Sequence, residues 1–256
     1  AMGKIIFIGE LPLNLIFGRD GGVTVRPCDR IGRAAAALAA AGHSVVMVGE
    51  AAADPVGDLI VGFLASAGVD VRSVDRFTEG RSPQRDIFEQ PDGTVRLVGY
   101  GREPDVEFDT VWPRIEPDDV VVFGSYFSLN DRVRPRLLDL LEHARARKAT
   151  VVYLPYFETF QVPRVTRVMP SVLDNMELAD VIVTTTDDLQ LIFGNRDAAD
   201  NYRLHIEFYT PRFYNIDTAS ATVEKFPERE KITVGTPGPG GVVDAMKSIL
   251  STLSRP

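Results

Sequence analysis

The stretch KITVGTPGPGGVVDAMKSIL, residues 231–250, has the pattern of a strand, a glycine-rich loop and a helix. We expect the strand at residues 232–234 and the helix at residues 242–250. The four glycines of the loop between them allow a tight turn and a close approach of the backbone to a ligand. Such a loop points backbone N–H groups at an anion, and the dipole of the following helix favours negative charge there. An ordinary strand-to-helix turn explains the loop by itself equally well.

Upstream of this stretch, apolar runs alternate with helical patterns along most of the chain. Strands are expected at residues 4–9, 44–48, 119–123, 150–154, 181–184, 203–209 and 221–226, with a further extended segment from residue 68. Helices are expected at residues 30–42, 54–67, 133–147, 172–179 and 187–193. This alternation of strands and helices indicates an α/β fold with a mainly parallel central sheet and helices on both of its faces.

Two turn signals interrupt the alternation. A glycine pair at residues 21–22 and the sequence PDG at residues 91–93 are typical of tight turns between paired strands. They predict lid hairpins at about residues 11–26 and 84–100, which would form a small separate sheet at the ligand edge of the main one.

Composition limits the class of protein. The chain has 256 residues, of which 45% are hydrophobic and 25% charged, as in a soluble globular protein. A net charge of −8 argues against non-specific binding of nucleic acid. No apolar run approaches the roughly 20 residues of a membrane-spanning helix, and no signal-peptide pattern is present. The single Cys28 excludes an intrachain disulfide, so we expect a cytoplasmic protein without membrane contact. The three histidines lack metal-ligand spacing, so no structural metal is expected.

The order of elements resembles the ribokinase-like (PfkB) carbohydrate kinases over nearly the whole chain. The most specific match is VGEAAADPVGDLIVGFLASAGVD, residues 48–70, which is similar to the family run V-G-x-x-x-x-D-x-x-G, a helix, and L-x-x-x-G-V-D. Asp54 and Gly57 fall in register with it. Asp54 could contact the substrate, although a helix N-cap is the preferred interpretation. The resemblance implies a single domain over residues 1–256, a three-layer α/β/α sandwich with a small β lid.

The glycine-rich loop is similar to the C-terminal signature of that family, D-T-x-G-A-G-D. In the family this loop holds the transferring phosphate, and its last Asp takes the proton from the sugar hydroxyl. The resemblance assigns the anion hole to Gly238, Gly240 and Gly241. The base position itself is Gly241, which has no side chain to accept a proton. The nearest carboxylate is Asp244, which we expect one helical turn further on and pointing away from the loop.

The positions that hold the sugar in the family also differ. The sugar-binding Asp is replaced by Asn14, which keeps an acceptor oxygen but loses the charge. The Asn of the first glycine signature is replaced by Arg33. Arg33 would suit an acidic or phosphorylated ligand, or it is a solvated arginine at a helix start, which is the preferred interpretation.

The N-x-x-E pair that organises magnesium and phosphate in the family corresponds to Thr185 and Asp188. These residues could still supply oxygen atoms to a magnesium-bound water. An equally good interpretation is that Thr185 or Thr186 caps the helix, while Asp187 and Asp188 complement its dipole. Only residues 242–256 follow the loop, so the family's adenine wall would be short unless a second subunit supplied it.

The resemblance implies ATP- and Mg²⁺-dependent phosphoryl transfer to a hydroxyl of a sugar or nucleoside. A base contributes about 10²–10⁴-fold to such a reaction, so its replacement predicts impaired catalysis. Three interpretations stay open: a divergent kinase, a catalytically inactive protein that binds ligand and regulates, and a structural interaction protein. The lid also predicts a homodimer, because exposed edges of small sheets pair readily. Its contact would use Phe17, Val23, Val25, Ile87, Phe88, Val95 and Leu97.

Overall fold

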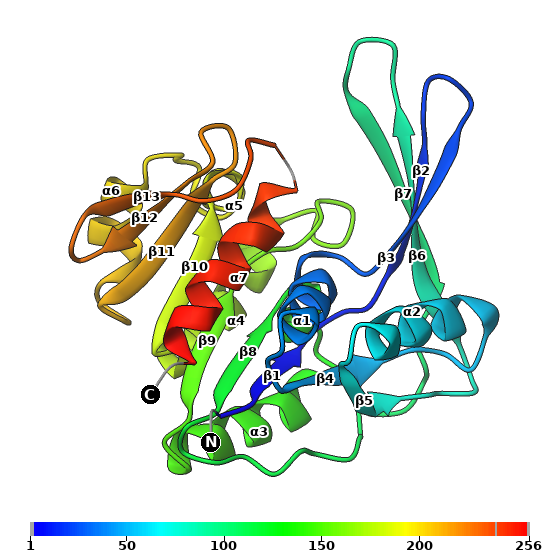
Figure 1. Cartoon of the computed structure of the whole chain (residues 1–256), viewed down its shortest axis with the longest axis horizontal. Helices are drawn as coiled ribbons and strands as arrows, with labels where there is room; N and C mark the ends of the chain where they lie inside the picture. Colours follow the sequence, from blue (N-terminus) through cyan, green and yellow to red (C-terminus); the bar gives the residue numbers. More distant parts are fainter. Residues whose placement is uncertain (1–2, 239, 255–256) are drawn as a thin grey trace. The chain divides into compact units, whose positions relative to one another are not determined.

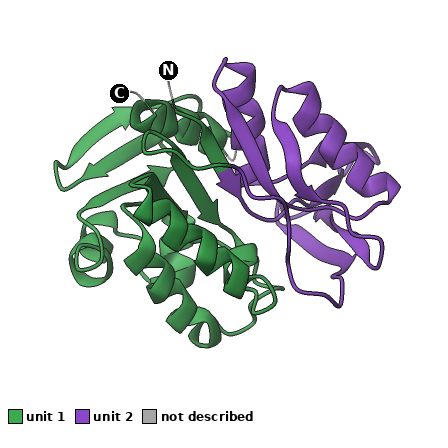
Figure 2. Ribbon diagram, turned by 90° about the horizontal axis from the view of Figure 1, so that it is seen from below, with its two compact units in different colours: residues 1–6, 114–256 green, residues 7–113 purple. Residues whose placement is uncertain are grey.

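The computed structural model describes residues 3–238 and 240–254. The chain divides into two compact units, shown in different colours in Figure 2. Unit 1 comprises Ala1–Ile6 and Arg114–Pro256, and unit 2 comprises Phe7–Pro113. Among the described residues, no helix is long and apolar enough to cross a membrane.

Strand pairing gives a nine-stranded sheet in the order β13-β12-β11-β10-β9-β8-β1-β4-β5. Pairing is parallel from β8 through β11, whereas β12 and β13 are antiparallel. The strands are β1 (Ile5–Ile8), β4 (Val45–Glu50), β5 (Asp70–Asp75), β8 (Val120–Gly124), β9 (Thr150–Leu154), β10 (Val181–Thr185), β11 (Arg212–Asp217), β12 (Thr222–Phe226) and β13 (Glu230–Thr233). Strands β8 and β10 are buried along their whole lengths, as expected for apolar runs covered by helices on both faces.

Helices cover both faces of the sheet within unit 1. In Figure 1, α7 lies in front of β9 and β10, while α3, α4 and α5 lie behind the strands. The helical segments of this unit are η1 (Tyr126–Leu129), α3 (Arg134–Ala146), α4 (Val165–Leu178), α5 (Thr186–Phe193), α6 (Ala198–Asn201), the π-helical turn η2 (Tyr202–Ile206) and α7 (Gly241–Leu253). The predicted α/β fold class is therefore confirmed.

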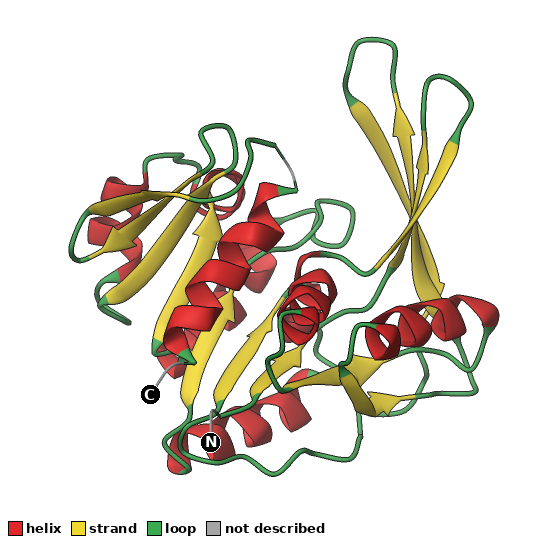
Figure 3. Ribbon diagram, viewed as in Figure 1, coloured by secondary structure: helices red, strands yellow, loops and turns green. Residues whose placement is uncertain are grey.

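Unit 2 contains two helices, α1 (Arg30–Ala40) and α2 (Pro55–Ser66), and the lid sheet. The lid strands are β2 (Leu13–Phe17), β3 (Val23–Pro27), β6 (Arg81–Glu89) and β7 (Val95–Arg102). They pair in the order β3-β2-β6-β7, so the two expected hairpins share one small sheet with β3 and β7 at its edges (Figure 3).

Two local predictions in unit 1 are wrong. Residues 203–209 were expected to form a strand, but η2, which directly follows α6, occupies the first part of this stretch and a turn occupies the rest. Asp197 begins the helix by accepting the N–H of Asp200 at 2.7 Å. The fully buried Asn201 then donates to the Asp197 carbonyl at 2.7 Å. These side chain–backbone bonds stabilise the helical turn that leads into residues 203–209. The strand at this place in the order is β11, which was not predicted.

Helix α4 is longer than the expected 172–179. It begins at Val165 and contains Pro170 inside the helix. A proline within a helical pattern usually marks a boundary, which is why the prediction started the helix after it.

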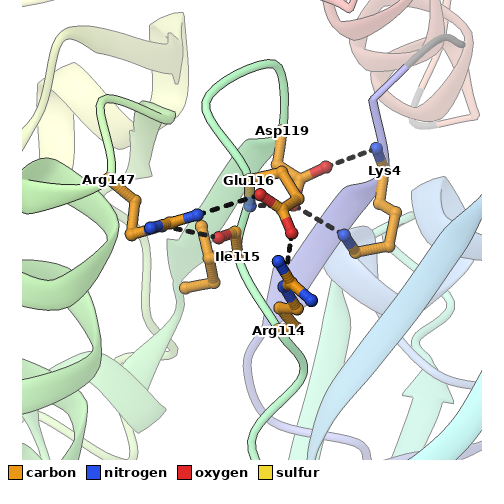
Figure 4. Close-up of polar contacts among 6 residues, drawn as sticks. All are labelled: Lys4, Arg114, Ile115, Glu116, Asp119 and Arg147. Atoms are coloured by element: carbon orange, nitrogen blue, oxygen red, sulfur yellow. Dashed lines mark hydrogen bonds and ion pairs between the residues drawn. The ribbon is translucent and has the colours of Figure 1, made fainter.

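A buried carboxylate organises the start of β8 (Figure 4). Asp119 accepts the Lys4 backbone N–H and the Lys4 ammonium, each at 2.7 Å, and the Glu116 N–H at 2.8 Å. Arg147 donates to a Glu116 carboxylate oxygen at 2.9 Å and to the Ile115 carbonyl at 3.1 Å. This network fixes the segment that enters β8 to the first residues of the chain in unit 1.

Candidate functional site

The glycine-rich loop leads into α7 as the sequence predicted. Gly235 and Gly238 have φ values of 68° and 119°, the left-handed backbone that favours glycine. The Gly238 N–H donates to the Thr218 carbonyl at 2.9 Å, which fixes the middle of the loop. Gly240 is the N-cap and Gly241 the first residue of α7. The Gly241 N–H donates to the Gly238 carbonyl at 3.0 Å, so Gly238 and Gly241, two of the three glycines predicted for the anion hole, use their N–H groups within this region. The next N–H groups of the first turn of α7 have no partner within the helix, and donors of this kind suit an anion.

The base position offers no space for a side chain. A Cβ built on Gly241 would lie 2.7 Å from the Thr236 carbonyl oxygen, which is closer than carbon atoms approach in folded proteins. Gly241 is buried, whereas at the neighbouring Gly240 a Cβ would meet nothing within 4 Å among the described atoms. The loop is therefore built around a glycine at position 241, and a carboxylate could not be added there without moving the backbone.

The nearest carboxylate lies closer to the loop than expected. We expected Asp244 to point away, but its Oδ2 atom lies 3.0 Å from the position that a Cβ on Gly235 would occupy. The expected orientation is wrong because the first turn of α7 packs against the beginning of the loop. Asp244 remains solvent-exposed.

The pair expected to organise magnesium forms a capping box instead. The Thr185 N–H donates to Asp188 Oδ2 at 2.7 Å, and the Asp188 N–H donates to Thr185 Oγ1 at 3.1 Å. Both residues are buried, with 4% and 6% of their surface exposed. The helix-capping interpretation is confirmed for this pair. The Asp188 Oδ2 atom is thus engaged by the backbone, and the expected role of the pair in organising magnesium stays a prediction.

A buried amide connects this helix start to the next strand. Asn215 on β11 accepts from Thr184 Oγ1 at 2.9 Å and donates to Thr186 Oγ1 at 3.1 Å. The sequence analysis missed Asn215, because β11 itself was not predicted. Its effect is to hold the threonines on both sides of Thr185 in place.

In unit 2, Asp54 is the N-cap of α2. Its carboxylate accepts the Gly57 N–H at 2.7 Å, the Ser82 N–H at 3.0 Å and the Ser82 hydroxyl at 2.9 Å. Burial alone would raise the pKa of Asp54, but these hydrogen bonds outweigh it and hold the pKa below its usual value. The N-cap interpretation is confirmed, and Gly57 is required because a Cβ there would lie 2.0 Å from the Ala52 carbonyl.

Asn14 is buried in the lid sheet. Its amide donates to the Cys28 carbonyl at 2.8 Å and to the Arg26 carbonyl at 3.3 Å. These bonds tie β2 to the end of β3. The side chain that stands where the family has its sugar-binding Asp therefore has its donor groups engaged within the hairpin.

Beside Asn14 lies a charged cluster that the sequence analysis missed. Arg85, its register partner on β6, is only 4% exposed. Its guanidinium lies 3.1 Å from a Glu10 oxygen and 3.5 Å from an Asp29 oxygen. The sequence does contain a signal for this cluster. Arg85 falls at an inward position of an alternating strand, and a charged residue at such a position is usually paired or functional.

Arg33 on α1 is half-buried, so it is not the fully solvated arginine of the preferred interpretation. Burial, followed by the positive charge of Arg26, lowers the pKa of the Arg33 guanidinium. Two arginines whose charges repel each other would gain from an anion between them.

Comparison with known proteins agrees with this geometry. The profile of the pfkB family carbohydrate kinases matches residues 33–207, which is more than half of the chain. The chain belongs to the pfkB family of carbohydrate kinases. No match was found among curated protein sequences.

Solved structures of kinases share the fold at low sequence identity. An apo fructokinase from Vibrio cholerae O395 superposes with a TM-score of 0.76 at 13% identity, covering 99% of this chain and 98% of its own. The adenosine kinase of Sinorhizobium meliloti gives 0.75 at 16% identity, covering 100% and 89%. An aminoimidazole riboside kinase from Salmonella enterica, complexed with its riboside and an ATP analogue, gives 0.76 at 15% identity, covering 92% and 77%. The fold is thus ribokinase-like.

Proposed function

We propose that this protein binds a sugar or nucleoside together with ATP at the site used by the pfkB family, and that its phosphoryl transfer is severely impaired. The observation that carries the proposal is the closed base position at Gly241. A general base contributes about 10²–10⁴-fold, or roughly 3–5 kcal/mol of the barrier. A protein that had lost only the carboxylate would keep space for it, whereas here the Thr236 carbonyl fills that space.

The rest of the site supports binding more than turnover. The loop keeps glycines and a helix start suited to phosphate, so anion binding survives the loss of the base. In contrast, Asp188 is used by the capping box and is not presented to a metal ion. Electrostatic stabilisation of the transferring phosphoryl group is the main catalytic effect in such reactions, and it depends on that metal.

A thermal-shift screen followed by calorimetry tests the binding half of the proposal. Ligands for the screen are ATP and ADP with magnesium, fructose, adenosine and aminoimidazole riboside, chosen from the ligands of the structural relatives. A ligand present at 100 times its dissociation constant stabilises the native state by about 2.7 kcal/mol, which gives a clear rise in melting temperature. If none of these ligands raises it, the protein is a structural interaction protein that keeps only the fold.

A slow kinase is the second candidate, and the position of Asp244 against Gly235 favours it. In that case Asp244 replaces the missing base from the first turn of α7. The variant Asp244→Asn would then abolish residual ADP release while leaving ligand binding intact. Under the main proposal the same variant changes neither quantity.

We also propose that the lid forms a homodimer contact, with a narrower set of residues than the sequence suggested. The strand register places Phe17, Val23, Val25 and Phe88 on one face of the lid sheet. Phe17 and Phe88 stack with ring centroids 4.7 Å apart, and Val23 and Val25 are 54% and 51% exposed. The other face carries Asn14, Ile87 and Leu97, so substrate and partner would use opposite faces.

A further inference from the structure

Unit 1 has a second hollow, far from the glycine-rich loop. It lies where β9, β10 and β11 begin, the lower end of these strands in Figure 1, whereas the loop before α7 lies at the end where β10 finishes. Its volume is about 650 Å³, within the range of small-molecule sites. The residues that line it and carry polar groups are Arg145, Lys148, Thr150, Glu177, Asp180, Tyr209, Thr210 and Arg212.

Three cations face this hollow from two different elements. Arg145 and Lys148 come from the end of α3, and Arg212 begins β11. All three are exposed, and the side chains of Arg145 and Lys148 form no hydrogen bond or ion pair with the residues that the structure describes, whereas the charge of Arg212 interacts with Glu228. Arg147, in the same run, is different, because Glu116 and the Ile115 carbonyl already engage it (Figure 4). The hollow is therefore lined by two cations without a partner among the described residues, Arg145 and Lys148, together with Arg212.

Two carboxylates also line the hollow. Asp180 Oδ2 accepts the Val151 N–H at 2.8 Å, so this carboxylate is engaged in a hydrogen bond to the backbone. Glu177 is exposed. Three cations against two carboxylates leave the lining with a positive charge, although the chain as a whole carries −8.

The conformation of Lys148 adds an independent observation. Its φ is 63°, the left-handed position that follows a helix and is usually taken by glycine. A residue with a Cβ costs about 1–2 kcal/mol there. The negative end of the α3 dipole explains why a cation stands at this position, but it does not explain why the residue is not a glycine. The dipole also does not account for Arg212, which begins a strand. Backbone strain of this kind occurs at functional sites, and among the described residues Lys148 shares it with Cys28, Ser125, Ala221 and Arg229.

We propose that this hollow is a binding site for a small phosphorylated ligand, separate from the family's substrate and nucleotide site. Arginine binds phosphate through two parallel N–H donors, and lysine binds it as a point charge, so these three residues match a phosphate group in charge and in hydrogen-bond donors. Tyr209 offers an aromatic surface to the rest of the ligand. Because the site lies at the opposite end of the strands from the loop, its ligand would not compete for the residues of the loop.

Calorimetric titration of the full chain with inorganic pyrophosphate at low salt tests the proposal. The variants are Arg145→Gln and Arg212→Gln, and Arg147→Gln is the matched control from the same run of cations. Loss of one charged hydrogen-bond partner should weaken pyrophosphate binding roughly tenfold in each pocket variant. The control should bind as the wild type does. Because Arg145 and Arg212 are exposed, circular dichroism should show both variants folded.

Three results would overturn the proposal. One is the absence of pyrophosphate binding at millimolar concentration. Another is binding that the pocket variants do not change, since the anion would then occupy a different place such as the glycine-rich loop. The last is an equal loss in Arg147→Gln, which would indicate general charge attraction. Failure of this proposal is distinguishable from failure of the proposed function, because sugar and ATP binding are measured with those ligands themselves.

Discussion

At the scale of single residues, two glycines one position apart play opposite roles. Gly241 is packed against the Thr236 carbonyl, while Gly240 faces open space. The sequence resemblance predicted that position 241 lacks the base, but it could not predict that the Thr236 carbonyl lies against this position. A protein that had only lost the carboxylate would keep room for a side chain at position 241. In this protein the backbone conformation of the loop leaves no such room.

The variant Gly241→Ala is expected to destabilise the protein by about 1–3 kcal/mol, because its Cβ would overlap the Thr236 carbonyl oxygen. Gly240→Ala is the matched control and should change stability by less than about 0.5 kcal/mol. Urea denaturation of both variants measures the difference. Equal stabilities would mean that the loop adapts freely, and Gly241→Asp would then be worth testing as a restored base.

Asp54 gives a pH-dependent prediction. Its pKa is lower in the folded protein than its usual value of 3.8, so it contributes stability above that pH and loses this contribution as the pH falls below 3.8. Asp54→Ala should cost about 0.5–2 kcal/mol at pH 7 through loss of the N-cap. The gap between variant and wild type should narrow as the pH falls below about 4. A gap that stays constant down to pH 2 would contradict the capping role.

At the scale of elements, the sequence predicted most helices and strands because their patterns are local. The lid hairpins, the buried strands and α2 follow from turn residues, apolar runs and the Asp54 cap. The failures occurred where a few specific hydrogen bonds decide the structure. Asn201 bonds to the backbone of α6, which leads directly into the stretch that was wrongly predicted as a strand, and Pro170 is accommodated inside α4.

The site could be predicted only in part for the same reason. The loop and its glycines follow from local sequence, but the contacts of Asp244, Arg85 and Asn215 depend on pairing between distant segments. The role of Asp188 was ambiguous in the sequence. The structure shows that Asp188 takes part in the capping box at the start of α5.

Substitutions at the start of α5 test this assignment. Asp188→Ala should destabilise the protein by about 1–2 kcal/mol, because it removes half of the capping box. The neighbouring Asp187→Ala removes only an exposed ion pair with Arg196 and should cost less than about 0.5 kcal/mol. Thermal unfolding in the absence of metal compares the two. If Asp188 were instead a metal-associated carboxylate, its removal would leave stability without metal unchanged or higher.

At the scale of the whole molecule, the chain keeps the fold of its family. The lid exposes the apolar side chains of Val23 and Val25 on one face and carries Asn14 on its other face. The variant Val25→Glu places a charge on this apolar face, so it should shift a dimer to monomer in sedimentation at micromolar concentration. Leu97→Glu, on the opposite face, is the control and should leave the dimer intact. A wild type that sediments as a monomer would end the dimer proposal.

The measurement that tests the central claim most directly is ADP release from ATP and magnesium, with each sugar or nucleoside that raises the melting temperature. Kinases of this kind turn over at about 1–100 s⁻¹, and loss of the base alone lowers a rate by about 10²–10⁴-fold. We expect ligands to bind and substrate-dependent ADP release to remain at background. Release at an ordinary kinase rate would contradict the account and show that another group takes the proton in place of the residue missing at Gly241.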